Sequence, residues 1–145
     1  MSLEGPWLVT AVIERQSASV EVPLAMTARS RSQPVQTIQM PGQPTLYNID
    51  LSDGRLLDAY LDPGKPGLNE LHLTFIAGQS ELPIPTPAKV TVARPGEAPR
   101  VLPVRRFGPG HFIVDAQLGA GDWQIEVTAA TAAGRTLHAR FTAHL

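Results

Sequence analysis

Apolar and polar residues alternate in short segments along most of the chain, with the period of two that is typical of β-strands. In the segment 69–77, the apolar residues Leu71, Leu73 and Phe75 occupy one face and polar residues occupy the other. The same alternation predicts further strands near 87–94, near 111–118, and in two segments between Trp123 and Ala143. The pattern therefore indicates strands that each bury one face and leave the other in solvent.

Turn-forming residues separate these segments. The fourteen prolines and twelve glycines leave no stretch of helical periodicity long enough to predict a helix. Hairpin turns are predicted at Ser52-Asp53-Gly54-Arg55, at Gly108-Pro109-Gly110 and at Ala133-Gly134. From Thr45 onward this gives roughly seven or eight short strands at the spacing of a sandwich. We predict an all-β fold: an immunoglobulin-like antiparallel β-sandwich with an extra N-terminal hairpin.

The chain divides into two predicted regions. Residues 44–145 contain enough strands for a complete sandwich, whereas residues 1–43 comprise a β-hairpin followed by a Pro-rich linker over 29–43. The hairpin opens at Gly5-Pro6-Trp7, and the final hairpin of the sandwich opens similarly at Gly121-Asp122-Trp123. This similarity suggests a weak internal repeat.

An isolated two-stranded hairpin is only marginally stable in water, so the first hairpin should pack on another element. Three alternatives remain open from the sequence. It is the end of a preceding sandwich repeat, it packs on the sandwich of the same chain, or it packs on a neighbouring chain in a homodimer.

Composition removes several classes of function. With 145 residues, 43% of them apolar, the chain can form a real core. A net charge of −1 gives no basic face, so we expect no nucleic-acid partner. The absence of cysteine excludes disulfides, thiolate zinc sites and a cysteine nucleophile. No apolar run reaches the roughly 20 residues of a membrane span, and the first residues lack the features of a signal peptide.

Catalytic motifs are absent from the sequence. There is no Gly-x-Ser-x-Gly elbow, phosphate-binding glycine loop or His-Glu-x-x-His. The serines after residue 32, Ser52 and Ser80, both lie in turn-like settings. We therefore expect no enzyme. Four carboxylates cluster in the sequence, and turn or solvent-facing roles account for them better than a calcium site does: Asp50, Asp53, Asp58 and Asp62.

Histidines are the best remaining candidates for chemistry. His72 follows Glu70 by two residues on the outward register of its strand, and His111 begins a strand after a turn. Neutral imidazole suits copper, zinc or nickel. We predict His72, His111 and Glu70 as metal ligands; the alternative is ordinary surface histidines, because two ligands without a third do not make a site. His138 and His144 face outward on the last strand but are too far apart to share one ion.

Three short motifs follow one another between residues 60 and 145: Asp62-Pro63-Gly64 leading to Asn69-Glu70-Leu71-His72, then Gly108-Pro109-Gly110-His111-Phe112, then Gly121-Asp122-Trp123. This order resembles the C-terminal soluble domain of copper transport and resistance membrane proteins of the CopC/CopD type, and it is similar to YtkA-like domains. The motifs consist of turn and core residues, so they concern the fold more than the chemistry.

The resemblance implies an immunoglobulin-like sandwich displayed outside the cytoplasmic membrane. It implies the membrane-embedded portion of the same parent protein as the partner, and it makes copper a candidate cofactor without establishing that this domain binds it. Copper-binding members of the broader group use an N-terminal histidine, but this chain has no histidine before His72, so that site cannot be carried over. We expect a non-catalytic extracytoplasmic accessory domain that acts by protein contacts or weak copper binding. The alternative is a purely structural or adhesive sandwich with no metal role.

Overall fold

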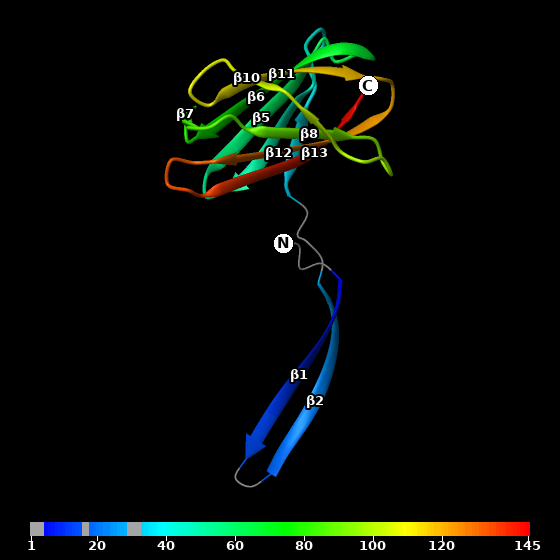
Figure 1. Cartoon of the computed structure of the whole chain (residues 1–145), viewed down its shortest axis with the longest axis vertical. Coiled ribbons are helices and arrows are strands. Elements are labelled where there is room, and N and C mark those ends of the chain that lie inside the picture. The colour runs from blue at the N-terminus through cyan, green and yellow to red at the C-terminus, as the bar shows by residue number, and fades with distance from the viewer. Residues whose placement is uncertain (1–4, 16–17, 29–32) are drawn as a thin grey trace. The chain divides into compact units, whose positions relative to one another are not determined.

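The computed structural model describes residues 5–15, 18–28 and 33–145 (Figure 1). The chain forms two compact units, Met1–Ser32 and Gln33–Leu145. Throughout the described ranges the regular elements are antiparallel β-strands, so the predicted all-β class is confirmed. The same ranges contain no helix long and apolar enough to cross a membrane.

The first unit is a two-stranded hairpin, as predicted. Strand β1 (Gly5–Arg15) pairs antiparallel with β2 (Ala18–Ala28). The pairing runs without interruption from Gly5 opposite Ala28 to Arg15 opposite Ala18.

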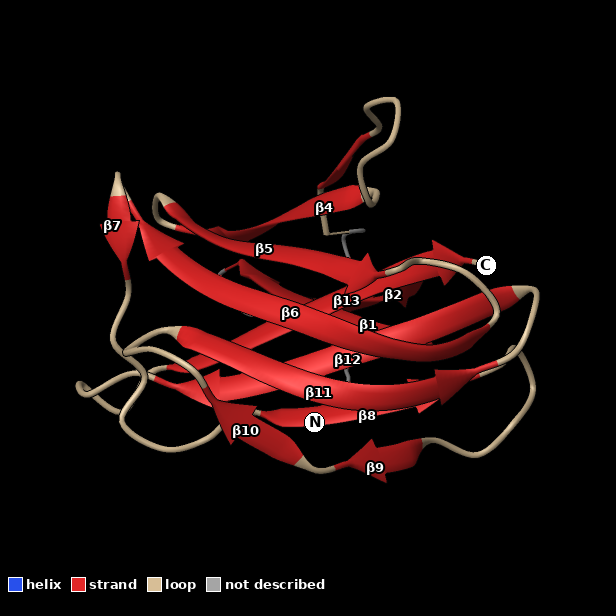
Figure 2. Cartoon of the chain, turned by 90° about the horizontal axis from the view of Figure 1, so that it is seen from above, coloured by secondary structure: helices blue, strands red, loops and turns tan. Residues whose placement is uncertain are grey.

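The second unit is a β-sandwich, whose larger sheet contains seven strands in the order β10-β11-β6-β5-β4-β3, with β7 also paired to β6. Its strands are β3 (Val35–Ile38), β4 (Leu46–Ser52), β5 (Arg55–Asp62), β6 (Gly67–Ala77), β7 (Ser80–Glu81), β10 (Val104–Arg106) and β11 (His111–Leu118). The smaller sheet has the order β13-β12-β8-β9. Its strands are β8 (Lys89–Ala93), β9 (Arg100–Leu102), β12 (Asp122–Ala130) and β13 (Thr136–His144) (Figure 2).

The core lies between these two sheets. Alternate residues of each central strand point inward, and Leu71, Leu73 and Phe75 of β6 are fully buried as the alternation predicts. The Phe75 ring meets that of Phe112 on β11 edge to face, with centroids 6.1 Å apart. Truncating one such ring to alanine costs about 3–5 kcal/mol of stability. The side chains on the outer face of each sheet are therefore carried by strands that are fixed by the packed core.

The turn between β5 and β6 depends on one buried polar side chain, Asn69. Its Oδ1 accepts a hydrogen bond from the Gly64 amide at 2.8 Å, and its Nδ2 donates to the carbonyl of Lys65 at 2.8 Å. An unpaired amide in that position would cost about 1–3 kcal/mol. Asn69 thus fixes the start of β6, directly before Glu70.

One strand lies where the sequence predicted linker. Residues Val35–Ile38 form β3, which pairs with β4 at the edge of the larger sheet. Only four residues pair, and Pro34 precedes them, which an edge strand tolerates. The preceding Gln33 donates to the carbonyl of His138 on β13 at 2.9 Å and accepts from the Arg140 amide at 2.9 Å. This side chain ties the beginning of the unit to the smaller sheet.

Candidate metal-binding site

Two predicted ligands lie on neighbouring strands of the larger sheet. Strand β6 pairs antiparallel with β11, so that His72 is opposite Ile113 and His111 is opposite Thr74. The two histidines are therefore diagonal neighbours on the outer face, within reach of long side chains. They are 39 positions apart in the sequence, and only the strand pairing brings them together.

The imidazole rings of His72 and His111 face each other through one nitrogen each. The distance from His72 Nδ1 to His111 Nε2 is 3.2 Å. Two imidazole nitrogens bound to one ion at about 2.0–2.1 Å lie about 3 Å apart in tetrahedral or square-planar geometry. The pair therefore already has the spacing of two ligands of a single ion. Without an ion, the N–H of one ring donates a hydrogen bond to the unprotonated nitrogen of the other.

Aromatic rings hold both imidazoles in place. Tyr60 on β5 is the cross-strand partner of His72, and the two rings stack with centroids 4.5 Å apart and planes within 4°. The exposed ring of Phe107 meets His111 edge-on at 4.9 Å. Sequence reasoning missed both aromatic residues, although Tyr60 alternates with the inward residues Ala59 and Leu61 and so had to face outward.

A glycine sets the position of His111. Any Cβ on Gly110 would lie 2.4 Å from the carbonyl oxygen of Leu82 and 3.0 Å from that of Phe75. The Gly110 carbonyl in turn accepts a hydrogen bond from the Phe75 amide at 2.9 Å. Because backbone surrounds this position, a larger residue would push the chain before His111 out of place.

Glu70, the third predicted ligand, also lies at the site, but on the far nitrogen of His72. Its carboxylate is 3.7 Å from His72 Nε2. Arg105 on β10 binds the same carboxylate at 3.3 Å and that of Asp115 at 3.1 Å. Glu70 therefore lies beside the outer nitrogen of His72, beyond hydrogen-bond distance, on the side where a carboxylate commonly accepts the second ring N–H of a ligating histidine.

The surroundings of His111 favour its neutral form. Burial lowers the pKa of His111, a positive charge on His72 would lower it further, and Glu81 opposes these effects. A neutral imidazole keeps the lone pair that a metal ion needs. Burial, together with the charges of Asp62 and Glu70, raises the pKa of the Tyr60 phenol, which therefore stays uncharged.

The arrangement provides two nitrogen ligands. Within residues 5–15, 18–28 and 33–145, no group of three or more histidine, cysteine, aspartate or glutamate side chains is arranged to hold a metal ion. An ion between His72 and His111 would therefore take its remaining ligands from water or from a partner molecule.

The other histidines do not meet. His144 Nδ1 lies 2.7 Å from Asp122 Oδ1, and His138 Nε2 lies 3.9 Å from Glu126 Oε2. Each is exposed and lies beside a carboxylate of β12, the strand that pairs with its own strand β13. The two histidines are six positions apart on β13, and each lies beside its own carboxylate.

The clustered aspartates have local partners. Asp50 Oδ1 accepts from the Ser52 amide at 2.7 Å, and Asp53 pairs with Arg55 and Arg135. Asp58 accepts from Asn48 Nδ2 at 2.6 Å. These contacts agree with the turn and solvent roles expected of them.

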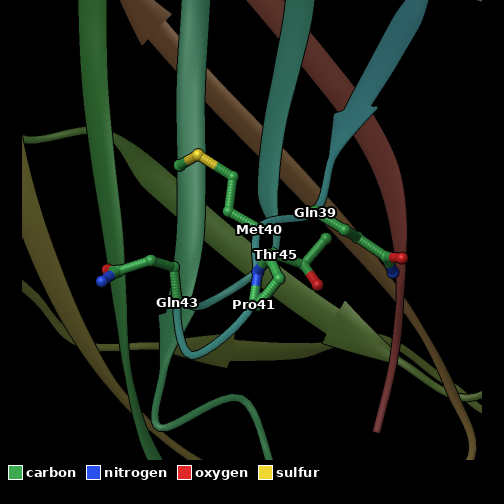
Figure 3. Close-up of a pocket in the computed structure, with 5 residues that line it drawn as sticks. All are labelled: Gln39, Met40, Pro41, Gln43 and Thr45. Atoms are coloured by element: carbon green, nitrogen blue, oxygen red, sulfur yellow. The ribbon is translucent and has the colours of Figure 1, made fainter.

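A shallow hollow of about 430 Å³ lies at the loop between β3 and β4 (Figure 3). It is lined by Gln39, Met40, Pro41, Gln43 and Thr45. Met40 supplies one exposed thioether, a suitable ligand for Cu(I), but the lining holds no imidazole or carboxylate to accompany it. The hollow therefore adds no chemistry to the site.

Comparison of the chain with protein-family models, curated proteins and solved structures found no match. The similarity to copper transport and resistance proteins thus rests on the sequence motifs alone.

Proposed function

We propose that this chain is a non-catalytic, copper-binding accessory domain that holds one ion between His72 and His111. The observation that carries the proposal is the 3.2 Å separation of His72 Nδ1 and His111 Nε2. The motifs that resemble copper transport and resistance proteins support copper as the ion. They also support an immunoglobulin-like sandwich displayed outside the cytoplasmic membrane, attached to the membrane-embedded part of its parent protein.

The geometry specifies how each histidine would coordinate. His72 would bind through Nδ1 and His111 through Nε2, because these nitrogens face each other. The Nε2–H of His72 would then point towards Glu70, whose carboxylate would accept it once their 3.7 Å separation closes to hydrogen-bond distance. For both facing nitrogens to bind the ion, the ring that donates the N–H hydrogen bond must carry its hydrogen on the outer nitrogen instead, so binding to two neutral imidazoles shifts one tautomer and releases no net proton.

Two neutral imidazoles favour Cu(II) among the divalent ions, because Cu(II) stands highest in the affinity order for such ligands. Structural zinc sites use four protein ligands, which this pair does not provide. Open coordination positions make binding weak but allow rapid exchange. The exposed Phe107 ring beside His111 offers a contact for a protein that delivers or receives the ion.

The alternative is a structural or adhesive sandwich in which the two rings serve only as a cross-strand hydrogen bond. It draws on the same distance, since 3.2 Å is also an ordinary hydrogen-bond length. The stacked Tyr60 ring would then serve the stability of the sheet.

A calorimetric titration with Cu(II), repeated with Cu(I) under reducing conditions, separates the two functions. The NMR signals of His138 and His144 in the same sample are internal controls. Saturable binding of one ion at micromolar concentrations, with the first signals perturbed at His72 and His111, is the expected result. Absence of saturable binding, or first perturbation at His138 or His144, would favour the structural alternative.

A further inference from the structure

The N-terminal hairpin repeats the residue pattern of the hairpin that closes the sandwich. In β1–β2, apolar residues pair with apolar residues at every second position, and the same is true of β12–β13 when the two tryptophans are aligned. The pairs in the first hairpin are Trp7–Met26, Val9–Leu24, Ala11–Val22 and Ile13–Val20. Their counterparts are Trp123–Ala143, Ile125–Phe141, Val127–Ala139 and Ala129–Leu137.

The two apolar faces differ in exposure. Ile125 and Phe141 are 0% and 3% exposed, because the larger sheet of the sandwich packs on them. Val9 and Leu24, at the corresponding pair, are 41% and 50% exposed. The N-terminal hairpin therefore carries the residue pattern of the inner face of a sandwich sheet, with Val9 and Leu24 exposed on it.

A proline shows which strand of the hairpin lies at an edge. Pro23 in β2 is opposite Thr10, and its counterpart in β13 is Arg140. Proline lacks the amide that a central strand needs, so β2 suits an edge. Strand β13 is likewise the edge strand of its sheet, whereas β12 also pairs with β8. By this correspondence, the free edge of β1 is the one that would accept a further strand.

A second hairpin would be too small a partner. Strands of 11 residues rise about 3.3 Å per residue and lie about 4.8 Å apart, so each hairpin face covers roughly 36 by 10 Å. Two such faces would bury roughly 700 Å² in total, whereas stable specific interfaces bury about 1,200 Å² or more. A wider sheet, as in the sandwich, is needed to cover the hairpin.

We propose that β1–β2 is the closing hairpin of a second sandwich with the architecture of Gln33–Leu145, formed by an earlier part of the same polypeptide. A strand equivalent to β8 would pair with the free edge of β1, and an apolar sheet would cover the face that contains Val9 and Leu24. The hairpin ends at Ala28, and Gln33 is already fixed to β13, so one sandwich would follow the next after a short connection.

Amide hydrogen exchange tests this in the full natural polypeptide that carries the sequence, alongside the 145-residue chain. In the 145-residue chain we expect fast exchange in β1 and β2 and slow exchange in β12 and β13. In the natural polypeptide, exchange in β1 and β2 should be at least 100-fold slower. Leu24→Asp should abolish this protection, while Leu8→Asp, at an exposed position on the opposite face, should preserve it. Slow exchange in β12 and β13 confirms that the following sandwich stays folded.

Three results would overturn the proposal. The first is equally fast exchange of β1 and β2 in both polypeptides. The second is a natural polypeptide without a strand-forming region ahead of Gly5. The third is protection in the 145-residue chain that rises with concentration and is lost with Leu24→Asp, which would identify a second copy as the partner.

Discussion

The two outer faces of the sandwich each carry a pair of histidines, and the pairs behave differently. On the larger sheet, His72 and His111 come from neighbouring strands, and their rings meet at 3.2 Å. On the smaller sheet, His138 and His144 come from a single strand and bind separate carboxylates on β12. Two residues on adjacent strands can converge on one ion, whereas residues six positions apart on one strand cannot.

The pairs also differ in how firmly they are held. The His72 side chain is 14% exposed and stacks on Tyr60, whereas the His144 side chain is 80% exposed. A ligand that is already ordered loses little conformational entropy when it binds an ion. The comparison shows that order and register, rather than the number of histidines, distinguish the candidate site.

Removing one histidine of the pair on the larger sheet should cause the largest loss of copper affinity. We expect His72→Ala to weaken Cu(II) binding roughly 100-fold or more, because one of only two protein ligands is lost. The matched His138→Ala change removes an imidazole from the other sheet and should alter affinity less than about twofold, since exposed sites act independently. Calorimetric titration measures both; equal losses in the two variants would show that copper binds histidines on the surface indiscriminately.

Gly110→Ala should displace His111 without removing a ligand. The added methyl group would meet the carbonyl oxygens of Leu82 and Phe75, so we expect a loss of about 1–3 kcal/mol in the free energy of unfolding. Copper affinity should fall roughly 10-fold or more, because small displacements spoil ligand geometry. Gly134→Ala is the control for lost stability, since Gly134 has φ of 76° in a turn on the smaller sheet. Urea unfolding measures the stability of both variants, and calorimetry measures their copper affinity. Full affinity in both variants would contradict a site that depends on the position of His111.

Glu70→Gln tests the orienting carboxylate. We expect copper affinity to fall about 10-fold, the lower end of the effect of losing an outer partner of a ligating histidine. Glu126→Gln makes the same change beside His138 and should leave affinity unaltered. If Glu70→Gln weakens binding no more than Glu126→Gln does, Glu70 has no part in the site.

The smallest expected effect concerns pH. Because burial and a charge on His72 both lower the pKa of His111, its NMR titration midpoint should lie below the ordinary histidine value of about 6.5. The folded state then binds fewer protons than the unfolded state, so stability should fall as pH drops below about 6.5 and level off below the folded pKa. His72→Gln should raise the midpoint only partly, since burial is the larger cause. A midpoint at or above 6.5 in the wild type would refute a partly buried His111 whose charged form is disfavoured.

Much of the sandwich follows from local pattern. The alternation in β6, β11, β12 and β13 predicted the strands, the inward residues and the outward position of His72 beside Glu70. The meeting of His72 with His111 depends on which strands pair, and local periodicity contains no information on partners 39 positions apart. Strand β3 was missed because its four residues and flanking prolines resemble a linker, while its pairing with β4 decides its structure.

Pulsed EPR of the Cu(II)-loaded domain tests whether His72 and His111 share one ion, because it counts the imidazoles bound to the ion. We expect two coordinated imidazoles in the wild type, one in His72→Ala and one in His111→Ala, and two in His144→Ala. A wild-type spectrum with no imidazole or one, or two imidazoles that persist after His72→Ala, would contradict a copper site between β6 and β11.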